Sequence, residues 1–346
     1  MKHVIVIGGG IAGMQCAAEL ARGGIRVTVL EKQSDTGGKL RNWHKLFPSL
    51  TPAGEVLGGL NHTLRRLPNI DVRTECEAAE LSPRRVVLAT GEELECDAVV
   101  VATGFTLFDA RIKEEYGYGI YDNVITSADL EQMFNTGKVS TTSGAAPRRI
   151  AFLHCVGSRD EKVCQRHCSK VCCVTGVKQA MEMKELFPAA DVFNFYMDIR
   201  MFGPGYEEMY REAQQRCNIH FVRGRISEVS PTIDGRLQIK AEDTLTGRPL
   251  KIGVDMLVLL IGMRANDMNA VLEQRCGLER QTSGFMRPRD QFLHNTESNV
   301  AGIFYAGAVT APKSVGESLN EGTAAARGVI EYLAAKECTD NSTIDE

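Results

Sequence analysis

The fold is decided by residues 3–32, HVIVIGGGIAGMQCAAELARGGIRVTVLEK. A short run of β-branched residues leads into three glycines and then into a helix-forming stretch rich in Ala and Leu, and a second apolar run ends at Glu31. This pattern predicts a strand, a helix and a second strand. The glycines match GxGxxG between strand and helix, where they allow a sharp turn and the close approach of a pyrophosphate. We therefore predict a dinucleotide-binding site.

A turn of this type places the start of its helix against the ligand. Free N–H groups and the helix dipole favour phosphate there, and an acid at the end of the second strand accepts hydrogen bonds from the ribose. Glu31 lies at that position, 18 residues after Gly13. A glycine-rich turn without a ligand is the alternative, but strand, helix and acid together favour the dinucleotide. The residues predicted to bind it are Gly8, Gly10, Ile11, Ala12, Gly13, Glu31 and Lys32.

Three later motifs favour FAD over NAD. Thr36-Gly37-Gly38 follows the acid, Ala102-Thr103-Gly104 ends an apolar strand, and GIFYAGA (residues 302–308) precedes a helix. These motifs resemble the two-dinucleotide-binding flavoprotein superfamily over nearly the whole chain. The resemblance implies an α/β fold of two Rossmann-like, three-layer ββα domains of the thioredoxin-reductase type, with the FAD domain interrupted by the second domain. It adds to the predicted FAD site Gly37, Gly38, Lys39, Leu40, Ala102, Thr103, Gly104, Gly307 and Ala308.

The last predicted helix begins with a capping box. Ser314 and Glu317 have the spacing at which a helix start is capped reciprocally. By resemblance, this helix start faces the N1/O2 edge of the flavin, where the N–H groups of Val315 and Gly316 would stabilise negative charge. Lys313 is a candidate for a further positive charge there. A well-capped helix beside a solvated lysine is the alternative. The predicted FAD site therefore also includes Lys313, Ser314, Val315 and Gly316.

The middle of the chain reads as a second α/β domain. Residues 135–147 are rich in Ser, Thr, Gly and Ala, as a flexible linker is. We predict an FAD-binding domain of residues 1–125 and 285–335, a second domain of residues 148–284, and a flexible tail of residues 336–346.

Five of the eleven cysteines lie within residues 155–173, between a predicted strand (149–155) and a predicted helix (169–187). Reductases of the superfamily carry a second GxGxxG at this point, and it is missing here. Four thiolates suit a 4Fe-4S cluster; a structural zinc site takes the same ligands, and free or disulfide-forming thiols are a third possibility. Proximity to a flavin favours iron and sulfur, because zinc carries no electrons. The candidate ligands are Cys155, Cys168, Cys172 and Cys173.

The cysteine segment carries a narrower resemblance. CVGSRDE (155–161), CSKVCC (168–173), GGKLRNWHKLFP (37–48) and AGAVTAPKSVGES (306–318) closely resemble the A-type subunit of heterodisulfide reductase. In that family the four matching cysteines hold a 4Fe-4S cluster beside FAD. Cys164 falls outside the family spacing, as a spare thiol or an alternative ligand. The Gly-Ala of the 306–318 motif, where the superfamily usually has Gly-Asp, is also the family's form.

The resemblance implies a flavin-dependent oxidoreductase without catalytic side chains, because the redox chemistry belongs to the cofactors. The chain lacks the ferredoxin-like segments of the methanogen protein and looks like the short form found in heterodisulfide-reductase-like complexes of sulfur-oxidising microbes. There a homodimer would pass electrons between flavin and cluster to B- and C-type subunits. The alternatives are an electron-bifurcating subunit of a methanogen-type enzyme, a stand-alone NAD(P)H-dependent disulfide or polysulfide reductase, and a non-catalytic FAD and zinc scaffold.

Composition argues against several other classes. Forty Lys and Arg against 44 Asp and Glu give a net charge of −4, which disfavours nucleic acid and anionic lipid as partners. The longest apolar runs, such as residues 256–263, are far shorter than the roughly 20 residues that cross a bilayer. The start of the chain has no signal-peptide pattern, so we expect a cytoplasmic protein without a membrane span.

Overall fold

The computed structural model describes residues 1–342, with side chains described to residue 337. The chain forms two compact units. Unit 1 comprises Met1–Arg41, Gly54–Thr106 and Arg264–Glu346. Unit 2 comprises Asn42–Ala53 and Leu107–Met263.

The elements of unit 1 form a parallel sheet, an antiparallel sheet and their helices. They are β1 (His3–Ile7), α1 (Ile11–Arg22), β2 (Arg26–Leu30), the 3-10 helix Gly38–Asn42, α2 (Ala53–Arg66), β5 (Ile70–Arg73), β6 (Ala78–Ser82), β7 (Arg85–Leu88), β8 (Glu93–Glu95), β9 (Ala98–Val101), α6 (Met268–Cys276), β20 (Ile303–Tyr305) and α7 (Val315–Ser342). The parallel sheet has the order β20-β9-β1-β2-β5.

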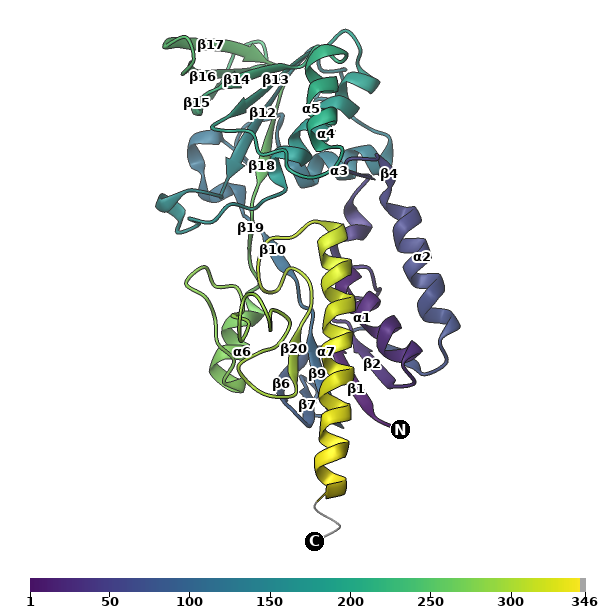
Figure 1. Cartoon of the computed structure of the whole chain (residues 1–346). Helices are drawn as coiled ribbons and strands as arrows, with labels where there is room; N and C mark the ends of the chain where they lie inside the picture. The colour runs from purple at the N-terminus through teal and green to yellow at the C-terminus, as the bar shows by residue number, and fades with distance from the viewer. Residues whose placement is uncertain (343–346) are drawn as a thin grey trace. The chain divides into compact units, whose positions relative to one another are not determined.

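The β-branched residues of β1 are buried on both faces of this sheet. Val4 and Val6 pack with α1 and α7, which run side by side (Figure 1). Ile5 and Ile7 pack with residues of the antiparallel sheet β6-β7-β8. The alternation of neighbouring side chains between faces explains why a continuous apolar run forms the central strand of a three-layer unit.

Unit 2 repeats this architecture. Its elements are β3 (Lys45–Leu46), β4 (Thr51–Pro52), the 3-10 helices Ala110–Ile112, Glu114–Tyr116 and Glu161–Val163, β11 (Val124–Thr126), α3 (Ser127–Thr136), β12 (Arg149–Val156), α4 (Cys172–Leu186), β13 (Asp191–Tyr196), α5 (Tyr206–Gln215), β14 (His220–Arg223), β15 (Ile226–Pro231), β16 (Leu237–Asp243), β17 (Arg248–Val254) and β18 (Met256–Ile261). The short strands β10 (Phe105–Leu107) and β19 (Met263–Ala265) pair with each other.

The main sheet of unit 2 is parallel, in the order β11-β18-β12-β13-β14. Ile150 and Phe152 of β12 pack with α4 and α5 on one face, and Ala151 and Leu153 pack with the antiparallel sheet β15-β16-β17 on the other. Each unit is thus a three-layer, Rossmann-like α/β structure, and the predicted fold class is confirmed.

The boundaries of the units differ from the predicted domains. Residues 107–125 belong to unit 2, because β11 continues the unit 2 sheet beside β18. Residues 42–53 also belong to unit 2, where the His44 N–H donates to Glu131 Oε2 at 2.7 Å. Residues 264–284 belong to unit 1, since α6 packs against β6.

Three further segments differ from the prediction. Residues 135–147 are the end of α3 and a loop inside unit 2, in which the Thr142 N–H donates to Asn123 Oδ1 at 2.7 Å. Helix α4 begins at Cys172 instead of residue 169, because Lys170 has a left-handed φ of 65° that a helix does not accept. Of the predicted flexible tail, residues 336–342 continue α7, and residues 343–346 lie outside the described residues.

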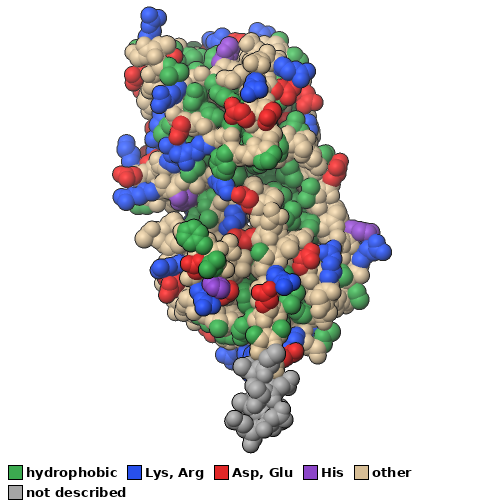
Figure 2. All heavy atoms as spheres, viewed as in Figure 1, with side chains coloured by type: hydrophobic (Ala, Val, Ile, Leu, Met, Phe, Trp, Pro, Cys, Tyr) green, Lys and Arg blue, Asp and Glu red, His purple; other side chains and the backbone are tan. Residues whose placement is uncertain are grey.

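The surface agrees with the small net charge. On the face that Figure 2 shows, Lys and Arg side chains are interspersed with Asp and Glu side chains. Among residues 1–342, no helix combines the length and the apolarity needed to cross a membrane.

Candidate functional site

All residues predicted to bind FAD lie in unit 1, after the carboxyl ends of parallel strands. They follow β1, β2, β9 and β20, or begin α7. The carboxyl ends of parallel strands share one edge of a sheet, where α/β proteins bind their ligands. The fold therefore gathers residues that are up to 308 positions apart in sequence, from Gly8 to Gly316.

The turn between β1 and α1 explains its glycines. Gly8 has a φ of 107°, and a Cβ there would lie 2.5 Å from the Ala102 carbonyl oxygen. A Cβ at Gly13 would overlap the carbonyl oxygen of Gly8. A Cβ at Gly10, in contrast, would meet no atom within 4 Å, and no side chain caps the helix that Gly10 precedes. The turn thus leaves open space beside the first N–H groups of α1, which suits a pyrophosphate.

Glu31 is held at this turn by two backbone groups. The Gly9 N–H donates to Oε2 at 2.9 Å, and the Gln33 N–H donates to Oε1 at 2.8 Å. Each carboxylate oxygen keeps a further lone pair for a ribose hydroxyl. Gly9 was not among the predicted residues, although the unbroken Gly-Gly-Gly run pointed to it.

The segment after Glu31 packs directly on the glycine turn. The Gly37 N–H donates to the Gly9 carbonyl oxygen at 2.7 Å, and a Cβ at Gly38 would lie 3.1 Å from Gly10 Cα. Leu40 is buried, whereas Lys32 is exposed. The Lys39 ammonium lies 4.8 Å from the Phe105 ring centroid. Burial, aided by the charge of Lys32, lowers the pKa of Lys39.

The turn after β9 carries a buried hydroxyl group. Thr103 Oγ1 is buried and has no hydrogen-bond partner among the described residues, and Gly104 is open on its Cβ side. Asn266 fixes this turn, because its Nδ2 donates to the Thr103 carbonyl oxygen at 2.8 Å. Sequence reasoning missed Asn266, since residues 264–284 were assigned to the other domain. The Thr103 hydroxyl can bind a ligand polar group.

The start of α7 has the predicted capping box. The Ser314 N–H and hydroxyl donate to Glu317 Oε2 at 2.9 Å and 3.0 Å, and the Glu317 N–H donates back to Ser314 Oγ. Lys313 is partly buried and paired: its ammonium lies 3.1 Å from Glu321 Oε2 and donates to the Gly307 carbonyl oxygen. Ala308 is buried beside this turn, and a Cβ at Gly316 would meet open space.

These observations test whether FAD suits unit 1. An uncapped helix start, a fixed acid, an unpartnered hydroxyl and three glycines with open space all lie at one sheet edge. Their chemistry matches a pyrophosphate, a ribose and a polar ring edge. The residues of unit 1 fit the cofactor.

The four candidate cysteine ligands lie at the β12–α4 connection of unit 2. Cys155 sits near the end of β12 with a left-handed φ of 61°, and Cys172 and Cys173 begin α4. These three are buried, and Cys168 in the connecting loop is half-buried. Cys164 is exposed at the turn after a 3-10 helix.

The three buried thiols form one hydrogen-bonded group. Hydrogen bonds with Cys172 lower the pKa of Cys155 and of Cys173, and the same contacts raise the pKa of Cys172. His154 also lowers the pKa of Cys173. His154 itself is buried and shares a hydrogen bond of 2.8 Å between its Nε2 and Asn194 Oδ1. A lowered thiol pKa favours the thiolate, the form that binds metals.

The residues between these cysteines are held rigidly. Ser158 and Ser169 hydrogen-bond each other, and the Met263 N–H donates to Ser169 Oγ at 2.8 Å. Asp160 is buried and pairs with the Lys113 ammonium at 2.8 Å. Burial raises the pKa of Asp160, but the hydrogen bond and the charge of Lys113 lower it, and the net shift is downward. The CVGSRDE motif therefore fixes the loop from which the ligands project.

The cysteine side chains are not arranged as metal ligands. Among the described residues, no group of three or more His, Cys, Asp or Glu side chains is arranged to hold a metal ion. Cys172 contacts Cys155 and Cys173 through hydrogen bonds. The charges of Cys155 and Cys168 both help to raise the pKa of Arg159, after its hydrogen bond with Asp198. The donor set suits four-thiolate ligation in number and burial, and the cluster stays a prediction.

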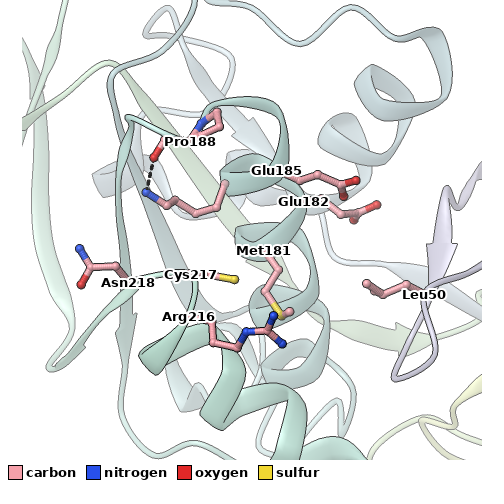
Figure 3. A pocket seen from close by; sticks show the side chains of 9 residues that line it. Leu50, Met181, Glu182, Glu185, Pro188, Arg216, Cys217 and Asn218 are labelled. Carbon is pink, nitrogen blue, oxygen red and sulfur yellow. Dashed lines mark hydrogen bonds between the residues drawn. The ribbon is translucent and has the colours of Figure 1, made fainter.

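One cavity, of about 520 Å³, lies elsewhere in unit 2 (Figure 3). Met181 and Glu185 of α4 and Arg216 and Cys217 at the end of α5 face it, with Leu50 from the β3–β4 hairpin. None of the predicted FAD or cluster residues lines this cavity. Its walls carry charges of both signs, so it does not select one class of ligand.

The two Rossmann-like units have the fold of thioredoxin-reductase-type flavoproteins, and the chain is a flavin-dependent oxidoreductase, as predicted. Solved structures agree in fold. Thioredoxin reductase of Lactococcus lactis superposes with a TM-score of 0.67 at 16% identity, over 97% of this chain and 100% of that one. Thioredoxin reductase of T. acidophilum gives 0.67 at 18% identity, over 97% and 99%.

The chain belongs to the pyridine nucleotide-disulphide oxidoreductase family, whose pattern matches residues 2–326. It is 31% identical to an A-type iron-sulfur subunit of the CoB–CoM heterodisulfide reductase of Methanopyrus kandleri, over 99% of this chain and 66% of the relative. It is 30% identical to the A-type subunit of the H(2):CoB-CoM heterodisulfide,ferredoxin reductase of Methanothermobacter marburgensis, over 94% and 63%. The predicted resemblance to the A-type subunit is confirmed, although the chain spans less than two thirds of the length of these relatives.

Proposed function

We propose that this chain is the electron-transfer subunit of a heterodisulfide-reductase-like complex, with FAD in unit 1 and a 4Fe-4S cluster in unit 2. The observation that carries the proposal is a difference in residue type at the same topological position of the two units. The strand–helix turn of unit 1 carries glycines, whereas the corresponding turn of unit 2 carries Cys155, Cys168, Cys172 and Cys173.

The residues of unit 1 would bind and orient the flavin. FAD supplies two-electron and one-electron chemistry when it is bound. The first N–H groups of α1 would bind its pyrophosphate, and Glu31 would accept from its ribose. The start of α7, with Lys313, would stabilise negative charge on the ring. Gly10 and Gly104 keep the space for these contacts open.

The residues of unit 2 would supply thiolates and tune them. A 4Fe-4S cluster accepts or gives single electrons, at a potential set partly by hydrogen bonds to its sulfurs. The Lys170 N–H donates to Cys168 Sγ at 3.3 Å, and the Arg200 backbone hydrogen-bonds Cys173. Both bonds would stabilise negative charge on the sulfurs.

Anaerobic purification tests the cofactors directly. We expect about one FAD and about four irons per chain. The Cys168→Ala variant should lose iron and keep FAD, because the two sites lie in separate units. Cys164→Ala is the matched control and should keep both, since Cys164 is exposed. About one zinc and no iron in the unmodified protein would replace the proposal with the zinc scaffold.

The larger setting of the protein is part of the same proposal. We infer a cytoplasmic homodimer that exchanges electrons with B- and C-type subunits during sulfur-compound oxidation, since the family resemblance implies these partners. The electron-bifurcating, methanogen-type subunit is the second candidate, favoured by the names of the relatives. A stand-alone reductase makes a different prediction: NAD(P)H alone would bleach the flavin without any partner.

A further inference from the structure

The turn between β20 and α7 carries a buried ion pair of Lys313 and Glu321. The ammonium lies 3.1 Å from Glu321 Oε2, and the two side chains are only 15% and 12% exposed. The ammonium also donates to the Gly307 carbonyl oxygen at 3.2 Å and to Thr310 Oγ1 at 2.5 Å. An ammonium has three N–H groups, and these three contacts occupy them. Lys313 therefore acts on a neighbouring ligand through its charge.

Glu321 is fixed at the same turn. Its carboxylate forms a hydrogen bond with the Gly307 backbone in addition to the pair with Lys313. Burial raises the pKa of Glu321, whereas Lys313 and Gly307 lower it, and the net shift is upward. A buried carboxylate is costly unless it is paired, so Lys313 favours the charged form of Glu321.

The carboxylate at this turn comes from an unexpected part of the chain. The turn begins with Gly307-Ala308, where the superfamily usually has Gly-Asp, and the negative charge is supplied by Glu321 of α7 instead. A Cβ at Gly307 would lie 2.6 Å from Ala12 Cβ, and a Cβ at Gly322 would lie 2.5 Å from the Ala12 carbonyl oxygen. The ion pair therefore lies beside the first turn of α1, at the sheet edge predicted to bind FAD.

We propose that Glu321 is a positioning residue that sets the reduction potential of FAD through Lys313. This inference rests on the proposed function, since it requires FAD in unit 1. Reduction by two electrons with one proton leaves one negative charge on the flavin ring, and a nearby cation stabilises that charge. Lys313 directly precedes the helix start that is predicted to face the ring, whereas Glu321 is rooted about 9 Å further along the axis of α7. The carboxylate thus holds the ammonium at the turn and offsets part of the charge that the ring meets.

The reduction potential of the bound flavin tests this role. The anaerobically purified protein is titrated against a dye of known potential at about pH 8, where carboxyl groups are ionised. Glu321→Gln removes the charge and keeps the hydrogen-bonding groups, so we expect the two-electron equilibrium to shift about tenfold toward reduction, which is about 30 mV upward. Lys313→Met removes the cation and should lower the potential. Glu331→Gln is the matched control, because its pair with Arg327 is exposed on the same helix, and it should leave the potential unchanged.

The opposite signs separate a charge role from a structural one. A pair that only holds the turn would lose FAD in both variants and shift the two potentials in the same direction. Glu321→Asp, which keeps the charge, should keep the potential close to that of the unmodified protein. The inference is wrong if Glu321→Gln leaves the potential unchanged, lowers it, or releases FAD. An unmodified protein that binds no FAD would instead remove the proposed function, on which the inference rests.

Discussion

The β1–α1 turn and the β12–α4 turn occupy the same position in two similar sheets, yet they are built from different residues. In unit 1 the turn is short, and Gly8 and Gly13 let backbone approach backbone closely. In unit 2 the connection runs from Gly157 to Val171, and thiols replace the glycines. Under the proposed function, one architecture would offer N–H groups to a phosphate in one unit and sulfur to a metal in the other, so that function would belong to the turn and not to the fold.

The two units also differ in how their interiors are stabilised. The core around α1 and α7 is apolar. The interior of unit 2 contains a charged group in which Lys178 of α4 pairs with Glu131 and, at 2.9 Å, with Glu182. His44 reaches the same group, with its Nδ1 2.7 Å from Glu182 Oε1. This group ties residues 42–53 to the helix that begins with two of the predicted cluster ligands.

The largest effect is expected from breaking that buried group. Lys178→Met leaves two buried carboxylates without their cation, and we expect a loss of about 3 to 5 kcal/mol from the free energy of unfolding. Urea unfolding followed by circular dichroism measures it. Lys240→Met is the control, because its pair with Glu228 is about half exposed and should cost less than about 1 kcal/mol. Equal losses in the two variants would show that the buried group does not stabilise unit 2.

Two substitutions in the glycine turn should affect stability and FAD binding differently. Gly13→Ala forces a Cβ onto the Gly8 carbonyl oxygen, so we expect a loss of about 3 kcal/mol in unfolding free energy and loss of FAD. Gly10→Ala meets no protein atom. It should keep its stability and lose FAD affinity, because its methyl group enters the ligand space. Unfolding curves and the ratio of FAD to protein distinguish the two variants. A Gly10→Ala protein with full FAD would place the phosphate elsewhere.

The sequence predicted the two turns better than the boundaries between units. Glycines and cysteines report their local chemistry directly, so Gly13 and Cys173 stood out from the sequence, and the structure places both at these turns. Their roles as ligand-binding residues stay predictions. In sequence, the hairpin of residues 45–52 lies between two segments of unit 1, but in the structure it belongs to unit 2. The neighbouring His44 holds it there by hydrogen bonds to Glu131 and Glu182. Such pairing over about 90 to 140 residues leaves no periodic pattern in the sequence. Asn266 was missed for the same reason.

Acid should weaken unit 2 through Asp160. The folded pKa of this carboxyl lies below its unfolded value, despite burial, because of Lys113. Its stabilising contribution is therefore complete above about pH 5 and is lost as the pH falls below about 4. Asp160→Asn should lower the unfolding free energy by about 2 kcal/mol at pH 7. The difference from the unmodified protein should shrink on acidification, as measured by urea unfolding at each pH. A difference that stays constant down to pH 3 would contradict this role.

The smallest change in stability is expected from removing either of two capping boxes, one in each unit. Ser314 and Glu317 cap α7, and Thr126 and Asp129 cap α3 in the same reciprocal way. Ser314→Ala and Thr126→Ala should each cost about 1 kcal/mol of unfolding free energy. Only Ser314→Ala should also weaken FAD binding, because the N–H groups that it orients are those predicted to face the ring. Fluorescence titration of FAD into each protein measures this difference. Equal FAD affinity in the two variants would make the start of α7 a well-capped helix and nothing more.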